Sequence, residues 1–391
     1  YVYFKKVEMS LVLNLNTTQE NGGIYDLGSG TERNTTYSRT MNVGDNFVLP
    51  TDRYVTKYER DENIDAQNLF VYNEGYSLAY YSLSQDGSTR DYVPGNTVTL
   101  SMSASGGMVL YAVWEKAVAY IKDAISFEGS SAFALYFTTL NEAVSEIESD
   151  ATSLTGRMQS TTLCICDDVV LTETITFTKA LNLYAVENKT ISMSDRFASN
   201  MPMFIFSNGG QTFSFGSNER GTDFVISGSS KSQSLIVVNN GSYVEFGESV
   251  TFTGALSSAN GGVMTVLGDA TGGANVVIKG SKFLSNRALN GGAIYVDGGT
   301  VRITNNTMFG DAEKGNVAGA NGGAIYVMSG SVIVEQAKFS FNQATNGGAI
   351  FIKSTGALTF DNEMATENAI MFTSNSANTS GGALYFERQG S

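Results

Sequence analysis

The sequence predicts an all-β protein in which residues 161–391 form a right-handed parallel β-helix, a solenoid of stacked coils. Gly-Gly pairs recur along this part of the chain, and short apolar runs separated by polar turns lie between them with no helix interposed. The chain has 42 Gly but only 3 Pro, and 42% of its residues are hydrophobic. This composition excludes collagen and disordered chains and favours a folded protein with many tight turns.

Residues 1–116 are expected to form a separate small β-rich domain. Runs rich in Tyr, Val, Leu and Thr alternate there with turn signals such as Asp86-Gly87 and Pro94-Gly95. The last strand of this domain is expected at residues 108–114.

Residues 117–160 are predicted to be a linker followed by the one amphipathic helix of the chain. Thr139 and Glu142 have the spacing of a capping box, which places the helix start there. The apolar residues that follow fall on one helical face. They are Leu140, Ala143, Val144 and Ile147.

The Gly-Gly pairs define the repeat of residues 161–391. They are Gly261-Gly262, Gly291-Gly292, Gly322-Gly323, Gly347-Gly348 and Gly381-Gly382, and their first glycines lie 25 to 34 residues apart. Self-similarity at this period indicates a repeat architecture. We interpret the pairs as structural turns, because Gly allows a sharp bend at positive φ without a Cβ clash. Asn precedes four of the five pairs and also tolerates this conformation.

A Phe-x-x-Asn motif precedes three of the pairs. Its copies are Phe283 to Asn286, Phe339 to Asn342 and Phe372 to Asn375, with a weaker copy at Met308 to Asp311. We expect the Phe rings to stack inside the coils. We expect Asn286, Asn342 and Asn375 to end strands and to form hydrogen bonds with Asn in neighbouring coils, as in stacked sheets.

Together the two motifs resemble the repeats of chlamydial polymorphic outer-membrane proteins and related bacterial adhesins. The resemblance implies a β-helix on a bacterial surface. The helix followed by strands from about residue 163 is similar to the entry of many bacterial β-helices. There an amphipathic helix caps the first coil, whose strand edges are otherwise open.

Residues 1–116 resemble internalin B-type repeats of bacterial surface proteins. The resemblance rests on four segments. They are residues 21–23 (Asn-Gly-Gly), 75–78 (Gly-Tyr-Ser-Leu), 92–95 (Tyr-Val-Pro-Gly) and 110–114 (Leu-Tyr-Ala-Val-Trp). It implies a small β-grasp-like fold. This copy departs from the pattern by its greater length and by Tyr81 where Trp is common.

One repeat position is aromatic in four successive copies, as Tyr295, Tyr326, Phe351 and Tyr385. Thr265 in the earliest copy suggests that this position faces outward. Stacked aromatic rings there form a candidate binding face for sugar rings or protein. The alternative, which we favour, is a structural ladder, since aromatic neighbours on adjacent strands stabilise a sheet by themselves.

Charge and composition restrict the chemistry. A net charge of −14 disfavours nucleic acid and anionic lipid as partners, and no apolar run is long enough to insert into a membrane. The chain has no His, so the commonest metal ligand and general base are missing. Asp167 and Asp168 are the best carboxylate candidates for a hydrolase or lyase, but a turn role fits them better. Asp61, Glu62 and Asp65 are a weak acidic cluster, so we predict no catalytic residue, no metal site and no cofactor.

The function predicted from these features is that of a non-enzymatic adhesin-type protein, extracellular or on the cell surface. Its β-helix would bind an extracellular protein or glycan through many weak contacts. One alternative is a polysaccharide lyase or hydrolase on the same solenoid. Another is a fibre subunit that associates end to end, because the sequence shows no C-terminal cap and an open coil edge is adhesive. The chain starts without Met and lacks a signal peptide, so we expect a mature or excised segment.

Overall fold

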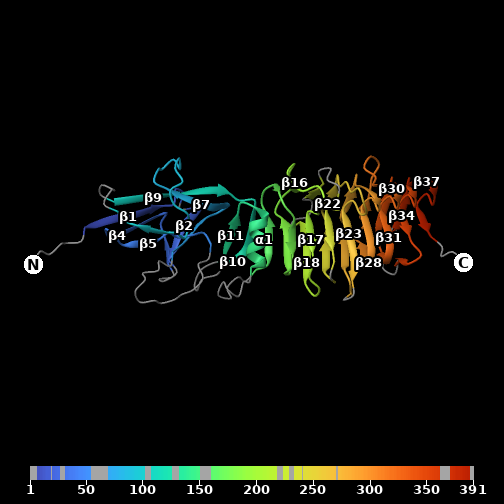
Figure 1. Ribbon diagram of the computed structural model, residues 1–391, viewed down its shortest axis with the longest axis horizontal. Coiled ribbons are helices and arrows are strands. Elements are labelled where there is room, and N and C mark those ends of the chain that lie inside the picture. Colours follow the sequence, from blue (N-terminus) through green and yellow to red (C-terminus); the bar gives the residue numbers. More distant parts are fainter. Residues whose placement is uncertain are drawn as a thin grey trace, which may run out of the picture. The chain divides into compact units, whose positions relative to one another are not determined.

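The computed structural model divides the chain into two compact units, residues 1–161 and 162–391, shown in Figure 1. The residues that it describes are 7–18, 20–26, 31–53, 69–101, 107–125, 132–149, 160–217, 223–228, 233–239, 241–269, 272–361 and 370–387. These residues are almost entirely β, with one helix, which confirms the predicted all-β class.

The N-terminal unit contains a sheet with strand order β3-β2-β6-β7-β9-β1-β4. All neighbours pair antiparallel except β1 and β9, which pair parallel, and β5 pairs with β8 beside the sheet. The strands are β1 (Glu8–Asn14), β2 (Gly22–Asp26), β3 (Thr31–Arg33), β4 (Thr36–Asn42), β5 (Asn46–Val48), β6 (Leu69–Asn73), β7 (Tyr76–Ser82), β8 (Thr97–Thr99) and β9 (Gly107–Lys116). Strand β9 covers the strand predicted at 108–114.

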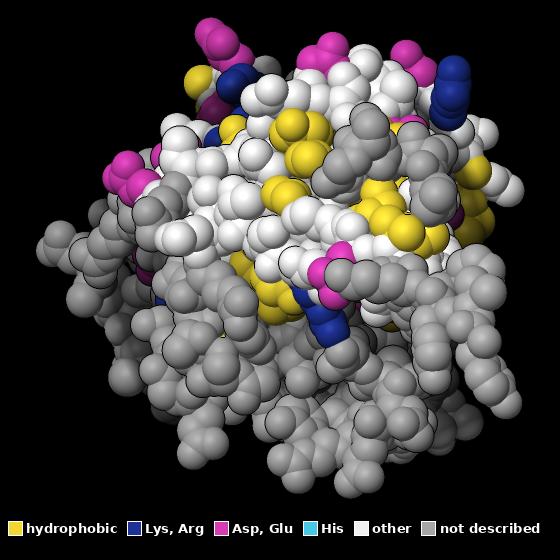
Figure 2. Space-filling view, turned by 90° about the vertical axis from the view of Figure 1, so that its left-hand side faces the viewer, with side chains coloured by type: hydrophobic (Ala, Val, Ile, Leu, Met, Phe, Trp, Pro, Cys, Tyr) yellow, Lys and Arg dark blue, Asp and Glu magenta, His cyan; other side chains and the backbone are white. Residues whose placement is uncertain are grey.

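Alternation along the strands builds the core of this unit. On β1, Leu11 and Leu13 are fully buried while their sequence neighbours are partly exposed, as expected for a sheet with one face covered. Tyr81 is also fully buried, and its hydroxyl donates to the carbonyl oxygen of Pro50 at 3.1 Å. Hydrophobic side chains on the face shown in Figure 2 form small patches separated by other side chains and by backbone.

The described residues between 117 and 149 pack against the N-terminal strands. Strands β10 (Ala119–Ile125) and β11 (Phe133–Phe137) form an antiparallel hairpin. The Phe133 ring lies 5.0 Å from Tyr72 and 5.7 Å from Tyr25, and Ala117 N donates to Gly75 O at 3.0 Å. Residues 117–160, which the sequence predicted to be a linker followed by a helix, therefore belong to the first compact unit.

Helix α1 (Leu140–Glu148) confirms the predicted helix and its start. Thr139 is the N-cap, and its hydroxyl oxygen accepts from Glu142 N at 3.2 Å, as N-cap threonines do. The predicted apolar face is buried, and α1 lies against β10 and β11. The capping of the first coil by this helix stays a prediction.

The second unit is built from parallel sheets in which each passage of the chain adds strands next to those of the previous passage. Its strands are β12 (Thr162–Ile165), β13 (Val169–Leu171), β14 (Ile175–Phe177), β15 (Leu181–Ala185), β16 (Lys189–Met193), β17 (Phe204–Phe206), β18 (Thr212–Ser217), β19 (Phe224–Ser227), β20 (Ile236–Val238), β21 (Tyr243–Phe246), β22 (Val250–Thr253), β23 (Met264–Asp269), β24 (Gly272–Gly273), β25 (Asn275–Lys279), β26 (Lys282–Leu284), β27 (Arg287–Asn290), β28 (Ile294–Thr304), β29 (Thr307–Phe309), β30 (Val317–Asn321), β31 (Ile325–Val334), β32 (Ala337–Ser340), β33 (Gln343–Asn346), β34 (Ile350–Ile352), β35 (Gly356–Phe360), β36 (Ile370–Thr373), β37 (Ser376–Ser380) and β38 (Leu384–Phe386).

Four parallel ladders connect these strands. The first runs β12-β15-β18-β21-β25-β28-β31-β35. The second runs β14-β17-β20-β23-β28-β31-β34-β38, and the long strands β28 and β31 join it to the first. The third runs β13-β16-β19-β22-β26-β29-β32-β36, and the fourth β27-β30-β33-β37. Figure 1 shows the strands side by side along this unit.

Phenylalanine rings stack through the interior of this unit, as predicted. Phe252, Phe283, Phe309 and Phe339 are fully buried. Successive ring centroids lie 4.7 to 4.8 Å apart with interplanar angles of 3° to 23°, and Phe372 extends the stack at 4.9 Å from Phe339. Each ring lies one strand spacing from the next. Burial of each ring contributes about 1.5–3 kcal/mol.

Candidate functional site

A buried asparagine ladder runs beside the Phe stack. Asn286 and Asn342 are fully buried and Asn375 is half-buried. The Nδ2 atom of Asn342 donates to Asn375 Oδ1 at 2.9 Å and to the carbonyl oxygen of Phe309 at 2.8 Å. Each side-chain amide forms hydrogen bonds both with a neighbouring Asn and with the backbone. The amides of this ladder are therefore buried without being left unsatisfied.

Asn316 is the rung of this ladder that the sequence analysis missed. It is fully buried, it accepts from Asn286 Nδ2 at 2.9 Å, and it donates to Asn342 Oδ1 at 3.0 Å. The weaker motif copy ends at Asp311, but the rung between Asn286 and Asn342 is Asn316. Asp311 lies in a loop and accepts from the backbone N of Glu313 and Lys314. The loop separates Phe309 from its Asn and breaks the Phe-x-x-Asn spacing.

A second asparagine ladder precedes the Gly-Gly pairs. Asn290 donates to Asn260 Oδ1 at 2.9 Å, Asn321 to Asn290 at 2.9 Å, and Asn346 to Asn321 at 3.1 Å. In this second ladder each Asn donates to the Asn that precedes it in the sequence. In the buried ladder each Asn donates to the Asn that follows it. The Asn that precedes four of the pairs is therefore a rung between coils as well as a turn residue.

The two glycines of each pair have different roles. The first glycine has a φ of +60° to +68°, a region that other residues rarely adopt. These glycines are Gly261, Gly291, Gly322, Gly347 and Gly381. In the first four pairs the second glycine lies against the backbone of the next coil. A Cβ on Gly292 would overlap the carbonyl oxygen of Gly323, and one on Gly323 would overlap that of Gly348.

The aromatic row consists of Tyr295, Tyr326, Phe351 and Tyr385, which occupy one register position on successive strands. Neighbouring centroids lie 5.0 to 5.4 Å apart, with interplanar angles of 5° to 19°. Ile294 and Val296 flank Tyr295 and are fully buried, so alternation places the row on the opposite face of the strands.

Little of the aromatic row is open to solvent. Tyr295, Tyr326 and Phe351 are only 9%, 7% and 5% exposed. Burial, followed by the nearby Asp297 carboxylate, raises the pKa of Tyr295 to about 12. Burial and then Glu387 raise the pKa of Tyr326. The arrangement favours a structural ladder, because a ligand would find little ring surface to cover.

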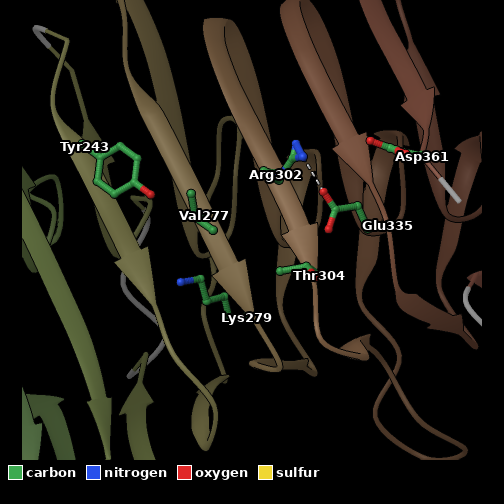
Figure 3. A pocket seen from close by; sticks show the side chains of 7 residues that line it. All are labelled: Tyr243, Val277, Lys279, Arg302, Thr304, Glu335 and Asp361. Atoms are coloured by element: carbon green, nitrogen blue, oxygen red, sulfur yellow. Dashed lines mark ion pairs between the residues drawn. The ribbon is translucent and has the colours of Figure 1, made fainter. Parts of the chain in front are cut away.

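An open groove on the first ladder was not anticipated from the sequence. Its volume is about 550 Å³, and it is lined by Tyr243, Val277, Lys279, Arg302, Thr304, Glu335 and Asp361. Figure 3 shows these side chains on neighbouring strands. They come from β21, β25 and β28 and from the residues that directly follow β31 and β35. Alternation along each strand hinted at outward side chains here, but only the register of the ladder brings them together.

Two ion pairs fix the charged side chains near the groove. Arg302 Nη2 lies 2.6 Å from Glu335 Oε1, drawn as a dashed line in Figure 3. Lys279 Nζ lies 2.7 Å from Glu245 Oε2. All four side chains are between 27% and 43% exposed, so water and a ligand can reach them.

Asp167 and Asp168 hold a turn between coils. Asp168 Oδ1 accepts from the backbone N of Thr190 at 2.8 Å, and Asp167 Oδ1 accepts from Asp168 N at 2.9 Å. Thr190 lies on β16, the neighbour of β13 in its ladder. These contacts agree with the turn role that the sequence favoured.

Within the described ranges, no three or more Cys, Asp or Glu side chains are grouped to hold a metal ion. Asp61, Glu62 and Asp65 lie outside those ranges. No helix in the described part of the chain is long and apolar enough to cross a bilayer.

Comparison with known proteins identifies one repeat. The family model described as Chlamydia polymorphic membrane protein (Chlamydia_PMP) repeat matches residues 369–387. The matched stretch contains one copy of both motifs, from Phe372 and Asn375 to Gly381 and Gly382. It points to a family of outer-membrane or surface proteins. No curated protein and no solved structure gave a match. The resemblance of residues 1–116 to internalin B-type repeats is unsupported and stays a prediction.

Proposed function

We propose that residues 161–391 form a right-handed parallel β-helix that serves as a stiff, non-enzymatic binding module on a bacterial surface. The observation that carries the proposal is the register of the four parallel ladders, which align equivalent residues over successive coils. Parallel crossovers within one sheet are right-handed in nearly all proteins. The repeat match at residues 369–387 supports a surface location.

Binding would come from the outer faces of the coils. The interior is filled by Phe and aliphatic side chains, and the buried Asn side chains form hydrogen bonds with one another. Because side chains fill the interior, partners meet outward side chains of many coils at once. We propose an extracellular protein or a glycan as the partner, and no catalysis by Asp167 or Asp168.

Protease shaving of intact source cells tests the location. Peptides from the exposed turns of residues 161–391 should appear in the supernatant of intact cells. Release only after lysis would contradict the proposal. Binding of the purified chain to immobilised extracellular proteins and to printed glycans tests the role, and a purified chain that binds neither would contradict it.

A second assay separates a binding module from a lyase or hydrolase. The chain should release no reducing sugar from polysaccharides to which it binds, and the Asp167→Asn, Asp168→Asn double variant should behave identically. Sugar release that this variant abolishes would favour the enzyme.

A further inference from the structure

The groove of Figure 3 offers an apolar contact beside polar groups. Tyr243 is 37% exposed, although it lies within a β-strand. Its ring and the half-buried Val277 provide the apolar part of the lining. A tyrosine ring gives a rigid apolar surface with a polar end, suited to a ligand that has both C–H faces and hydroxyls.

The polar side chains retain hydrogen-bonding capacity. Arg302 has five N–H donors and the Glu335 carboxylate has about four acceptor sites, of which their mutual ion pair uses only part. The Thr304 hydroxyl donates to Asn305 Oδ1 at 3.1 Å and keeps its capacity to accept a hydrogen bond. Because the ion pairs already fix the charged groups, a ligand that bonds to them need not order them.

The charges of the groove favour a neutral ligand. Lys279 and Arg302 are balanced in the lining by Glu335 and Asp361, and Lys279 is also paired with Glu245. The chain as a whole has a net charge of −14, which repels polyanions.

The shape of the groove favours an elongated ligand. The lining runs from β21 across β25, β28 and β31 to β35, which is four steps of about 4.8 Å, or roughly 19 Å. A ligand that is long, neutral, rich in hydroxyls and partly apolar is an oligosaccharide.

We propose that this groove binds a neutral oligosaccharide, with Tyr243 stacked on one sugar ring and Arg302, Glu335 and Thr304 bonded to hydroxyls. The inference rests on the proposed function and makes it more specific, since it selects a glycan as the partner and assigns its site. The aromatic row is not part of the site.

Calorimetric titration of the whole chain with cellohexaose, maltohexaose, chitohexaose and a heparin hexasaccharide tests this inference. At least one neutral hexasaccharide should bind, and the anionic one should bind more weakly. Tyr243→Ala and Arg302→Gln should each weaken binding about tenfold, equivalent to about 1.4 kcal/mol. Tyr243→Phe should retain most of the affinity, because it keeps the ring.

Lys338→Gln is the matched control. Lys338 is exposed on β32, which belongs to another ladder, so its loss should leave the affinity unchanged. Circular dichroism melts show whether each variant is folded. The inference would be overturned by no binding of any neutral hexasaccharide, by wild-type affinity in both groove variants, or by a preference for heparin.

The outcomes distinguish this inference from the broader proposal. If the chain is shaved from cells and binds an extracellular protein but no hexasaccharide, the groove assignment fails and the surface module stands. If the groove variants lose hexasaccharide binding but the protein is not at the surface, the groove assignment stands and the surface proposal fails.

Discussion

The Oδ1 atom of Asn342 accepts two hydrogen bonds from Asn316, one from its side-chain Nδ2 and one from its backbone N, each 3.0 Å long. Both side chains are fully buried. Asn342 in turn donates two side-chain hydrogen bonds. Both donor hydrogens and both acceptor positions of its side-chain amide are therefore used. A buried network of this kind fixes which residues of adjacent coils face one another.

Removal of one rung tests the importance of this network. Asn342→Ala deprives the Nδ2 and N of Asn316 and the carbonyl oxygen of Phe309 of a partner. Each buried group left unsatisfied costs about 1–3 kcal/mol, so the free energy of unfolding should fall by about 3–5 kcal/mol. Urea denaturation followed by circular dichroism measures the loss.

Asn378→Ala is the control for this prediction. Asn378 is exposed on β37, so its replacement should change stability by less than about 0.5 kcal/mol. Equal stability of the two variants would show that the ladder is not a stabilising network.

The second glycine of a pair should not tolerate a methyl group. In Gly323→Ala the new Cβ would overlap Gly348 O and would lie 2.7 Å from Gln343 N, both backbone atoms of the next coil. We expect a lower melting temperature or an insoluble protein. Gly319→Ala, three residues before the pair, meets only ordinary contacts at 3.7 Å or more and should fold normally. Similar melting of the two would contradict the close approach of the coils.

Much of the architecture follows from the sequence because its signals are local. The Thr139 cap and the apolar face of α1 lie within nine residues, and the Gly-Gly pairs repeat almost unchanged. Asn316 could not be found in this way, since a loop separates it from Phe309. The groove could not be found either, because only the register of five strands brings Tyr243 and Asp361 into the lining of the same groove. The packing of Phe133 on Tyr72, which joins residues 117–149 to the first unit, is also non-local.

The aromatic row should make the protein sensitive to alkaline pH. The pKa of Tyr295 is raised to about 12 in the folded state, against about 10 in the unfolded chain. A raised pKa gives a contribution to stability that is complete below pH 10 and lost as the pH rises toward 12. Tyr295→Phe should therefore lose less stability than the wild type between pH 10 and 12, measured by urea denaturation. Parallel decline of both proteins would contradict the assignment.

A buried carboxylate organises the N-terminal unit. Asp52 Oδ2 accepts from Leu78 N at 2.7 Å, from Ser77 Oγ at 3.1 Å and from Arg53 Nη1 at 3.0 Å. Asp52→Ala leaves the Leu78 amide without its partner and should destabilise this unit by about 2–4 kcal/mol. Hydrogen exchange at Leu78 should become faster. Glu74→Ala, at an exposed turn, is the control and should leave exchange at Leu78 unchanged. Unchanged exchange at Leu78 in Asp52→Ala would contradict the stabilising role of Asp52.

The distance between two spin labels at Thr212→Cys and Ala357→Cys tests the stacked coils most directly. Both positions are exposed. They lie in one register column through Tyr243, Asn275, Thr300 and Ser331. Five steps of about 4.8 Å predict a separation near 24 Å, widened only by the label linkers. Cys164→Ala and Cys166→Ala supply the background. A narrow distribution near 24 Å would agree with the β-helix, whereas a broad or much longer one would contradict it.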